Sequence, residues 1–164
     1  MSKTEKNLMD AFAGESQANR KYLAFAEKAD AEGYTQAARL FRAAAAAETV
    51  HAHSHLKVAG GINGTTENLK AAVSGETFEF TDMYPDMITV AEEEGNKAAV
   101  RSFTYANEVE KVHAELYQKA LDNLDQQADV TYYVCSVCGY TCEDEVPDIC
   151  PVCKAKAKAF FKVD

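Results

Sequence analysis

The feature that most constrains this chain is an internal repeat built around two Glu-x-x-His motifs. Glu48-Thr49-Val50-His51 and Glu110-Lys111-Val112-His113 lie 62 residues apart. Several preceding positions keep this offset, namely Tyr22/Tyr84, Gly33/Gly95 and Phe41/Phe103, whereas Gly14-Glu15 and Gly75-Glu76 are 61 residues apart. The second copy therefore carries one extra residue between Glu76 and Tyr84. A helix commonly absorbs such an insertion as a π-bulge, so we expect one there.

Each copy of the repeat predicts a pair of helices, because its apolar residues recur at helical spacing. The expected helices are 4–32 and 35–58 in the first copy, and 76–94 and 96–127 in the second. Gly33 and Gly95 are expected to end the first helix of each pair. A short helix from Thr66 is expected to lead to Gly75, and Pro85 must distort the third long helix. Four long helices with a long crossover predict an all-α, ferritin-like four-helix bundle.

The acidic and imidazole side chains of the repeat predict a metal centre. Glu and His at i, i+3 share one helix face, and Glu15 and Glu76 hold matching places on the partner helices. A Glu from each of two helices and a Glu-x-x-His from each of the other two is the ligand set of carboxylate-bridged di-iron bundles. Glu79 adds a carboxylate one turn after Glu76. His53 and His55 are left out of the ligand set.

Tyr22 and Tyr84 recur at matching positions near these carboxylates. They are either core aromatics or phenols that hydrogen-bond the ligand carboxylates, and we favour the second role.

The cysteines predict a second metal site in a separate small domain. All five lie between Cys135 and Cys153, where the composition shifts away from good helix formers. We place the domain boundary near residue 130, giving domains 1–130 and 131–164. A tail of about 34 residues needs a metal or disulfides to fold. The pairs Cys135-x-x-Cys138 and Cys150-x-x-Cys153 make a tetrahedral thiolate site for iron or zinc, which spacing does not distinguish. Cys142 is expected to be a free thiol.

Composition narrows the class of partner. The chain has 17 Lys and Arg against 26 Asp and Glu, a net charge of −9. This balance argues against nucleic acid or an anionic membrane surface as a partner. The sequence has no apolar run long enough to span a bilayer and begins with no apolar signal core, so a cytoplasmic location is expected.

Together these motifs resemble the rubrerythrin family over essentially the whole chain. The matching segments are Gly14-Glu15, Glu48–His51, Gly75–Glu79, Met83-Tyr84-Pro85, Glu110–His113, Cys135–Tyr140 and Cys150–Cys153. The resemblance implies that two irons are ligated by Glu15, Glu48, His51, Glu76, Glu79, Glu110 and His113, with Glu48 and Glu110 bridging. It implies that one iron exchanges Glu79 for His51 on reduction. It also implies that Cys135, Cys138, Cys150 and Cys153 hold a third iron, for which zinc is a possible substitute.

One position departs from the family pattern. Rubredoxin-type domains usually have Gly after the last cysteine, often with φ > 0, and this chain has Lys154. A side chain tolerates that conformation poorly, so strain or an altered potential is expected in the second cysteine turn.

The function expected from this resemblance is reduction of hydrogen peroxide to water. Glu79, His51, Tyr22 and Tyr84 are the candidate catalytic residues. Electrons are expected from an external donor, such as a rubredoxin or an NAD(P)H-dependent reductase, through the thiolate-bound iron. The resemblance implies a head-to-tail homodimer in which one chain's tail serves the other chain's di-iron site, and helix exchange between subunits stays open. Three alternatives remain: iron oxidation and storage, oxygen reduction, and a non-catalytic zinc-ribbon interaction module.

Overall fold

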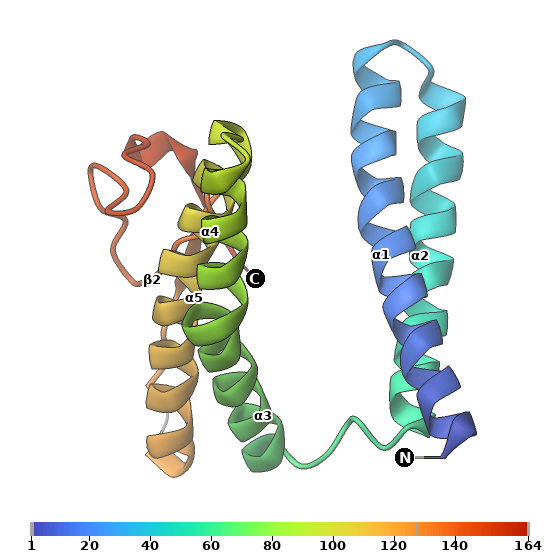
Figure 1. The fold of residues 1–164 in the computed structure, drawn as a ribbon, viewed down its shortest axis with the longest axis horizontal. Helices are drawn as coiled ribbons and strands as arrows, with labels where there is room; N and C mark the ends of the chain where they lie inside the picture. Colours follow the sequence, from blue (N-terminus) through green and yellow to red (C-terminus); the bar gives the residue numbers. More distant parts are fainter. Residues whose placement is uncertain (1, 127, 164) are drawn as a thin grey trace. The chain divides into compact units, whose positions relative to one another are not determined.

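The computed structural model describes residues 2–126 and 128–163. These residues form two compact units that divide between Asn63 and Gly64 (Figure 1). Within the described residues, no helix is long and apolar enough to cross a membrane.

The first unit is a hairpin of two long helices, α1 (Lys3–Ala31) and α2 (Thr35–Val58). The Ser2 side chain accepts a hydrogen bond from the Glu5 N–H, and the Glu5 carboxylate accepts one from the Ser2 N–H, so a capping box begins α1. Gly33 takes φ +85° in the turn, a conformation that glycine adopts without steric cost. Both helices expected in the first copy are confirmed, with bounds that differ by one residue at most.

Small side chains fill the contact between α1 and α2. Ala26 and Ala29 of α1 are buried against Ala38 of α2, with Phe41 packed beside them. The Asn19 side-chain amide donates to the Ala45 carbonyl at 2.7 Å and to the Thr49 hydroxyl at 2.8 Å. The alanine run of α2 therefore lets the helices approach closely, and Asn19 fixes their register.

The second unit contains the helices of the second repeat copy. A rod formed by α3 (Thr65–Phe78), a π-helix η1 (Glu79–Met83) and α4 (Tyr84–Glu93) packs along α5 (Lys97–Asp122). The expectation of a separate short helix ending before residue 76 is wrong, because the helix runs from Thr65 straight through Gly75. One glycine lowers helix stability by about 1 kcal/mol, which is too little to break a packed helix.

The last long helix ends earlier than expected. α5 stops at Asp122, and both the backbone N–H and the side-chain amide of Asn123 donate to the Lys119 carbonyl at its end. A 3₁₀ turn, Leu124–Gln126, follows. The end expected at residue 127 lies outside the described residues.

The insertion in the second repeat copy is a π-helix, as the offset predicted. The Tyr84 N–H donates to the Glu79 carbonyl, five residues back, instead of four. Pro85 follows at once, at the start of α4, where its missing N–H adds to the local change of geometry. The widened turn shifts the side chains of η1 around the rod relative to those of a regular α-helix.

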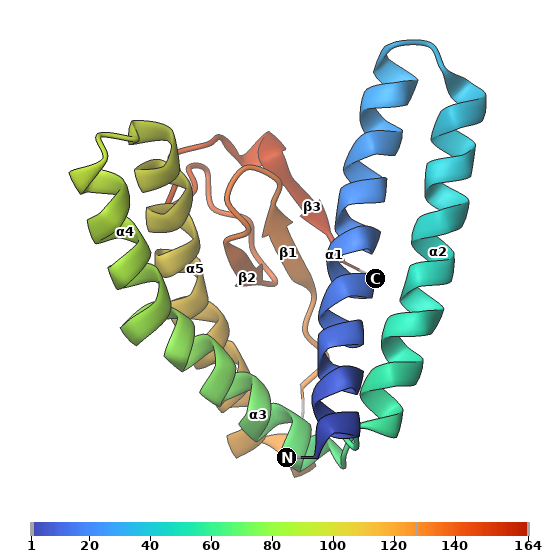
Figure 2. The same ribbon diagram turned by 45° about the vertical axis from the view of Figure 1, so that its right-hand side comes forward.

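The tail forms a small antiparallel sheet beside α5 (Figure 2). Its strands are β1 (Tyr132–Cys135), β2 (Thr141–Glu143) and β3 (Phe160–Lys162), in the order β2-β1-β3. Tyr133 pairs with Cys142 on one side and with Lys162 on the other. A 3₁₀ turn, Ala157–Ala159, leads into β3. The sheet thereby brings both cysteine turns to one end of the tail.

Candidate metal centres

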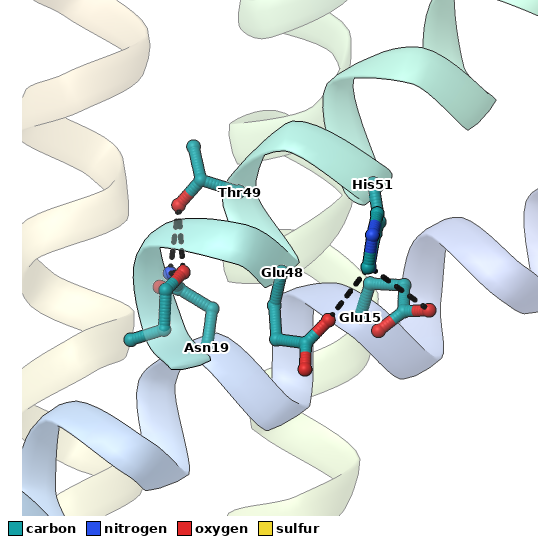
Figure 3. Close-up of polar contacts among 6 residues, drawn as sticks. Glu15, Asn19, Glu48, Thr49 and His51 are labelled. Atoms are coloured by element: carbon teal, nitrogen blue, oxygen red, sulfur yellow. Dashed lines mark hydrogen bonds and ion pairs between the residues drawn. The ribbon is translucent and has the colours of Figure 1, made fainter. Parts of the chain in front are cut away.

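The first triad consists of Glu15 from α1 and of Glu48 and His51 from α2. The His51 Nδ1 lies 2.9 Å from a Glu48 oxygen and 3.9 Å from a Glu15 oxygen. One ligand atom from each residue falls within 4.8 Å of the others. In Figure 3 both carboxylates turn toward the imidazole, while Asn19 and Thr49 hold the two helices together one turn away.

The second triad consists of Glu76 from α3 and of Glu110 and His113 from α5. Its ligand atoms also lie within 4.8 Å of one another, and the His113 Nδ1 is 2.7 Å from a Glu110 oxygen. Burial, and then the negative charge of Glu110, raises the pKa of Glu76 to about 7. Two carboxylates held together in this way favour a bound cation, and carboxylate with imidazole is a donor set that suits iron.

Glu79 lies beside the second triad without belonging to it. Burial and the charge of Glu110 raise its pKa, so the two carboxyl groups are electrostatic neighbours. Glu79 is the first residue of the π-helix, which sets the direction of its side chain. Its expected exchange with His51 stays a prediction, because the two residues belong to separate units. His53 and His55 lie in neither triad.

The tyrosines at matching repeat positions pack in the same way on their own units. The ring of Tyr22 lies tilted beside that of Phe41 with centroids 6.2 Å apart, and the ring of Tyr84 lies tilted beside that of Phe103 at 6.3 Å. Burial, and then the charges of Glu79, Glu110 and Glu76, raises the pKa of Tyr84, which places its phenol near these carboxylates. For Tyr22, the structure gives ring contacts with Phe25 and Phe41.

Tyr117 is a neighbour of the second triad that sequence reasoning missed. Burial, and then the charges of Glu76 and Glu110, raises the pKa of its phenol. The signal was available, because Tyr117 follows His113 by four residues and so shares its helix face. It has no tyrosine counterpart in the first copy, where the matching residue is His55.

The four-cysteine site is formed by the two cysteine turns of the tail. The sulfurs of Cys135 and Cys153 are 3.7 Å apart, and those of Cys138 and Cys150 are 3.6 Å apart. A tetrahedron with metal–sulfur bonds of about 2.3 Å has edges of about 3.8 Å, so the geometry fits a single ion. The pKa of the Cys150 thiol is lowered overall: burial by itself raises it, but hydrogen bonds from the backbone N–H groups of Cys153 and Val152 outweigh burial. Cys142 lies outside the site as a free thiol, as expected.

Lys154 adopts the backbone conformation that the departure from the family pattern implied. Its φ is +64°, and its N–H donates to the Cys150 carbonyl at 3.1 Å to close the second cysteine turn. Its side-chain Nζ donates to the Pro151 carbonyl at 2.7 Å. The strain expected at this residue is therefore present in the backbone, next to a metal ligand.

Fold and sites together define a di-metal carboxylate protein with a four-cysteine metal domain attached. The Rubrerythrin family model matches residues 6–121, and the model of the rubredoxin-like domain of rubrerythrin matches residues 133–161. The chain belongs to the rubrerythrin family. The helical part is therefore a ferritin-like domain and the tail a rubredoxin-like domain. As a member of this family the chain is a di-iron protein with a rubredoxin-type iron site, and the metal-ligating groups that the structure offers are one Glu/His group in each unit and the four cysteines of the tail.

Relatives match over almost the full chain. Rubrerythrin-2 of Clostridium acetobutylicum is 38% identical and the match covers 93% of this chain and 92% of that protein. Nigerythrin of Nitratidesulfovibrio vulgaris is 40% identical, with 92% of this chain and 81% of that protein covered. A solved structure of nigerythrin in its fully reduced, all-ferrous state aligns with a TM-score of 0.61 and 37% identity, over 99% of this chain and 88% of that one.

Proposed function

We propose that this protein is a non-haem di-iron peroxidase that reduces hydrogen peroxide to two waters. The reaction consumes two electrons and two protons for each peroxide. We propose that an external donor, a rubredoxin or an NAD(P)H-dependent reductase, supplies the electrons through the thiolate-bound iron. One observation carries the proposal: a four-cysteine site and a Glu/His triad lie in the same compact unit, against the same helix. A chain built only to store iron has no need of such a domain.

The proposed ligands of the di-iron site are the two triads with Glu79. Glu48 and Glu110 would be the carboxylates shared by the two irons, a role that comes from the family resemblance; in the structure each lies beside the histidine of its own motif. Iron supplies the two reducing equivalents when bound. The protein supplies a cage of carboxylates that holds cations in either oxidation state, and Glu79 and His51 are the proposed exchanging ligands.

The side chains around the second triad are suited to handling protons. Glu76, with its pKa near 7, holds or releases a proton near neutrality in the metal-free protein. Tyr84 places a phenol near Glu79 and Glu110 and keeps its proton, because burial and these charges raise its pKa. We propose that Tyr84 hydrogen-bonds a ligand carboxylate, and that Tyr22 does the same on the first triad.

We propose that the protein acts as a homodimer and that it is located in the cytoplasm. The proposed boundary between its bundle domain and its tail domain lies near residue 130. The triads lie in separate units, so the bundle forms either within one chain or by exchange of the α1–α2 hairpin between two chains. Apolar side chains on the helices support assembly, because Leu40, Val50 and Phe78 are 69%, 67% and 58% exposed. Light scattering on the iron-loaded chain tests this, and a large cage would favour storage instead.

Peroxide consumption by the iron-loaded protein tests the activity. The wild-type chain, supplied with a rubredoxin and a reductase, should consume peroxide with two electrons used per molecule. Glu110→Gln should lose di-iron binding and activity, whereas Cys150→Ser should keep the di-iron site but lose the flow of electrons. Cys142→Ser is the matched control and should behave as wild type. Equal activity in all four proteins would reject the proposal.

A further inference from the structure

The tail domain docks on α5 at three points along one side of that helix. Lys119 and Glu143 form an ion pair near the far end. In the middle, the His113 Nε2 lies 3.0 Å from the Thr141 hydroxyl oxygen. One turn earlier, the side chain of Val109 is 2% exposed and packs against Gly139 of the tail. A Cβ added to Gly139 would lie 3.8 Å from a Val109 methyl group, an ordinary van der Waals distance. The second triad therefore has a direct neighbour from the domain that carries the four cysteines.

Thr141 has a defined hydrogen-bond direction. Its hydroxyl donates to the Gly139 carbonyl at 3.1 Å. A hydroxyl has a single proton to give, so toward His113 the Thr141 oxygen acts as an acceptor and the Nε2 as the donor. The Nδ1 faces a Glu110 oxygen at 2.7 Å, and since a carboxylate only accepts, a proton lies between these two atoms in the metal-free protein. When a metal takes the Nδ1 lone pair in place of that proton, the remaining ring proton is on Nε2, where the Thr141 oxygen accepts it.

The equivalent histidine of the first copy lacks this support. His51 makes the same Nδ1 contact with the Glu of its own motif. Within the described part of the chain, no hydrogen bond to its Nε2 is present, and its side chain is 55% exposed against 28% for His113. The repeat is symmetric in its ligands, whereas within the second unit the tail adds a hydrogen-bond partner, Thr141, to the imidazole of the second copy.

We propose that Thr141 is a positioning residue that fixes the tautomer and ring orientation of His113 for metal binding. This rests on the proposed role of His113 as an iron ligand. A hydrogen bond to the far nitrogen of a ligating histidine orients the ring and makes it a better donor. Since Gly139 directly follows the ligand Cys138, the same two hydrogen bonds connect the backbone of the four-cysteine site to His113. Docking of the tail and alignment of His113 are thus one event.

Nuclear magnetic resonance of the full-length, zinc-loaded protein tests the proposal. The chain has four histidines, so ¹⁵N-histidine labelling gives a simple spectrum. In the wild type we expect a slowly exchanging Nε2–H on His113, with a cross-peak to the Thr141 methyl group. Thr141→Val keeps the shape and the strand and removes the hydroxyl, so this proton should exchange roughly tenfold faster. Thr141→Ser should keep it protected.

The matched control is Thr131→Val. Thr131 belongs to the same domain, and its backbone N–H, not its hydroxyl, bonds Asp144. This variant should leave the His113 signal unchanged. The proposal would be overturned if the wild-type protein showed no protected Nε2–H on His113, or if Thr141→Val protected this proton equally well. The first of these outcomes is measured on the wild-type protein, so it does not depend on whether a variant folds. The zinc-loaded protein carries out no redox reaction, so the His113 signal does not depend on whether the proposed peroxidase activity exists.

Discussion

Replacing Lys154 by glycine should stabilise the tail domain, although it removes a hydrogen bond. Lys154 holds φ +64°, and a left-handed conformation costs a residue with a Cβ about 1–2 kcal/mol. Glycine loses more backbone entropy on folding, about 0.6 kcal/mol. The lost bond from Nζ to the Pro151 carbonyl is exposed and so contributes about 0.5 kcal/mol, the low end for a hydrogen bond. Lys154→Gly should therefore raise the unfolding free energy by about 0.5 kcal/mol.

The neighbouring Lys156 provides the control of opposite sign. It has φ −74° and ψ 160°, an extended conformation that any residue adopts without strain. Lys156→Gly should lower the unfolding free energy by about 0.6 kcal/mol, from backbone entropy alone. Both variants remove one positive charge from the same short segment of the tail, so differences in net charge cancel between them.

Loss of the iron–thiolate absorbance in guanidinium measures both effects under anaerobic conditions. Free iron is held constant, because metal binding shifts apparent stability by mass action. The two midpoints should move in opposite directions from the wild type. If Lys154→Gly destabilises as much as Lys156→Gly, the left-handed backbone at Lys154 carries no cost and the argument from its φ is refuted.

Three further perturbations have defined outcomes. Cys150→Ser should abolish the iron–thiolate colour and lower iron content by one per chain, whereas Cys142→Ser should keep both, as iron analysis and visible spectra will report. Burial and the charge of Glu110 raise the pKa of Glu76 from 4.5 to about 7, so its contribution to the stability of the metal-free protein is full below pH 4.5 and is lost as the pH rises through 7. Because Glu76 is partly exposed, this contribution to the unfolding free energy is reduced to about 1 kcal/mol. Urea unfolding below pH 4.5 and above pH 7 should show the loss in the wild type and not in Glu76→Gln. Ala38→Leu should destabilise the α1–α2 hairpin by about 2 kcal/mol through overpacking, and the exposed Ala43→Leu should change thermal stability little.

The two Glu/His groups could be predicted from sequence because the repeat places their residues in helical register. Glu48 and His51 share a face at any helix position, and the copy at Glu110 and His113 excludes chance. The change of offset from 61 to 62 residues likewise predicted the π-helix that begins at Glu79. Local geometry and arithmetic suffice for such features.

Features that depend on tertiary contacts could not be predicted from the sequence. The helix runs through Gly75 because packing of α3 on α5 overrides the low propensity of one glycine. Thr141 lies 28 residues from His113 in sequence, and no local pattern connects a strand residue to a helix ligand. Tyr117 could have been found from its spacing to His113.

The most direct test of the proposed function is an anaerobic stopped-flow experiment on the fully reduced, iron-loaded protein. It is mixed with hydrogen peroxide or, separately, with oxygen, and the returning colour of the thiolate-bound iron is followed. We expect rapid reoxidation by peroxide and slow reoxidation by oxygen. Rapid reoxidation by oxygen with a sluggish response to peroxide would contradict it, and would identify an oxidase or ferroxidase in which the role of Glu79 and His51 must differ.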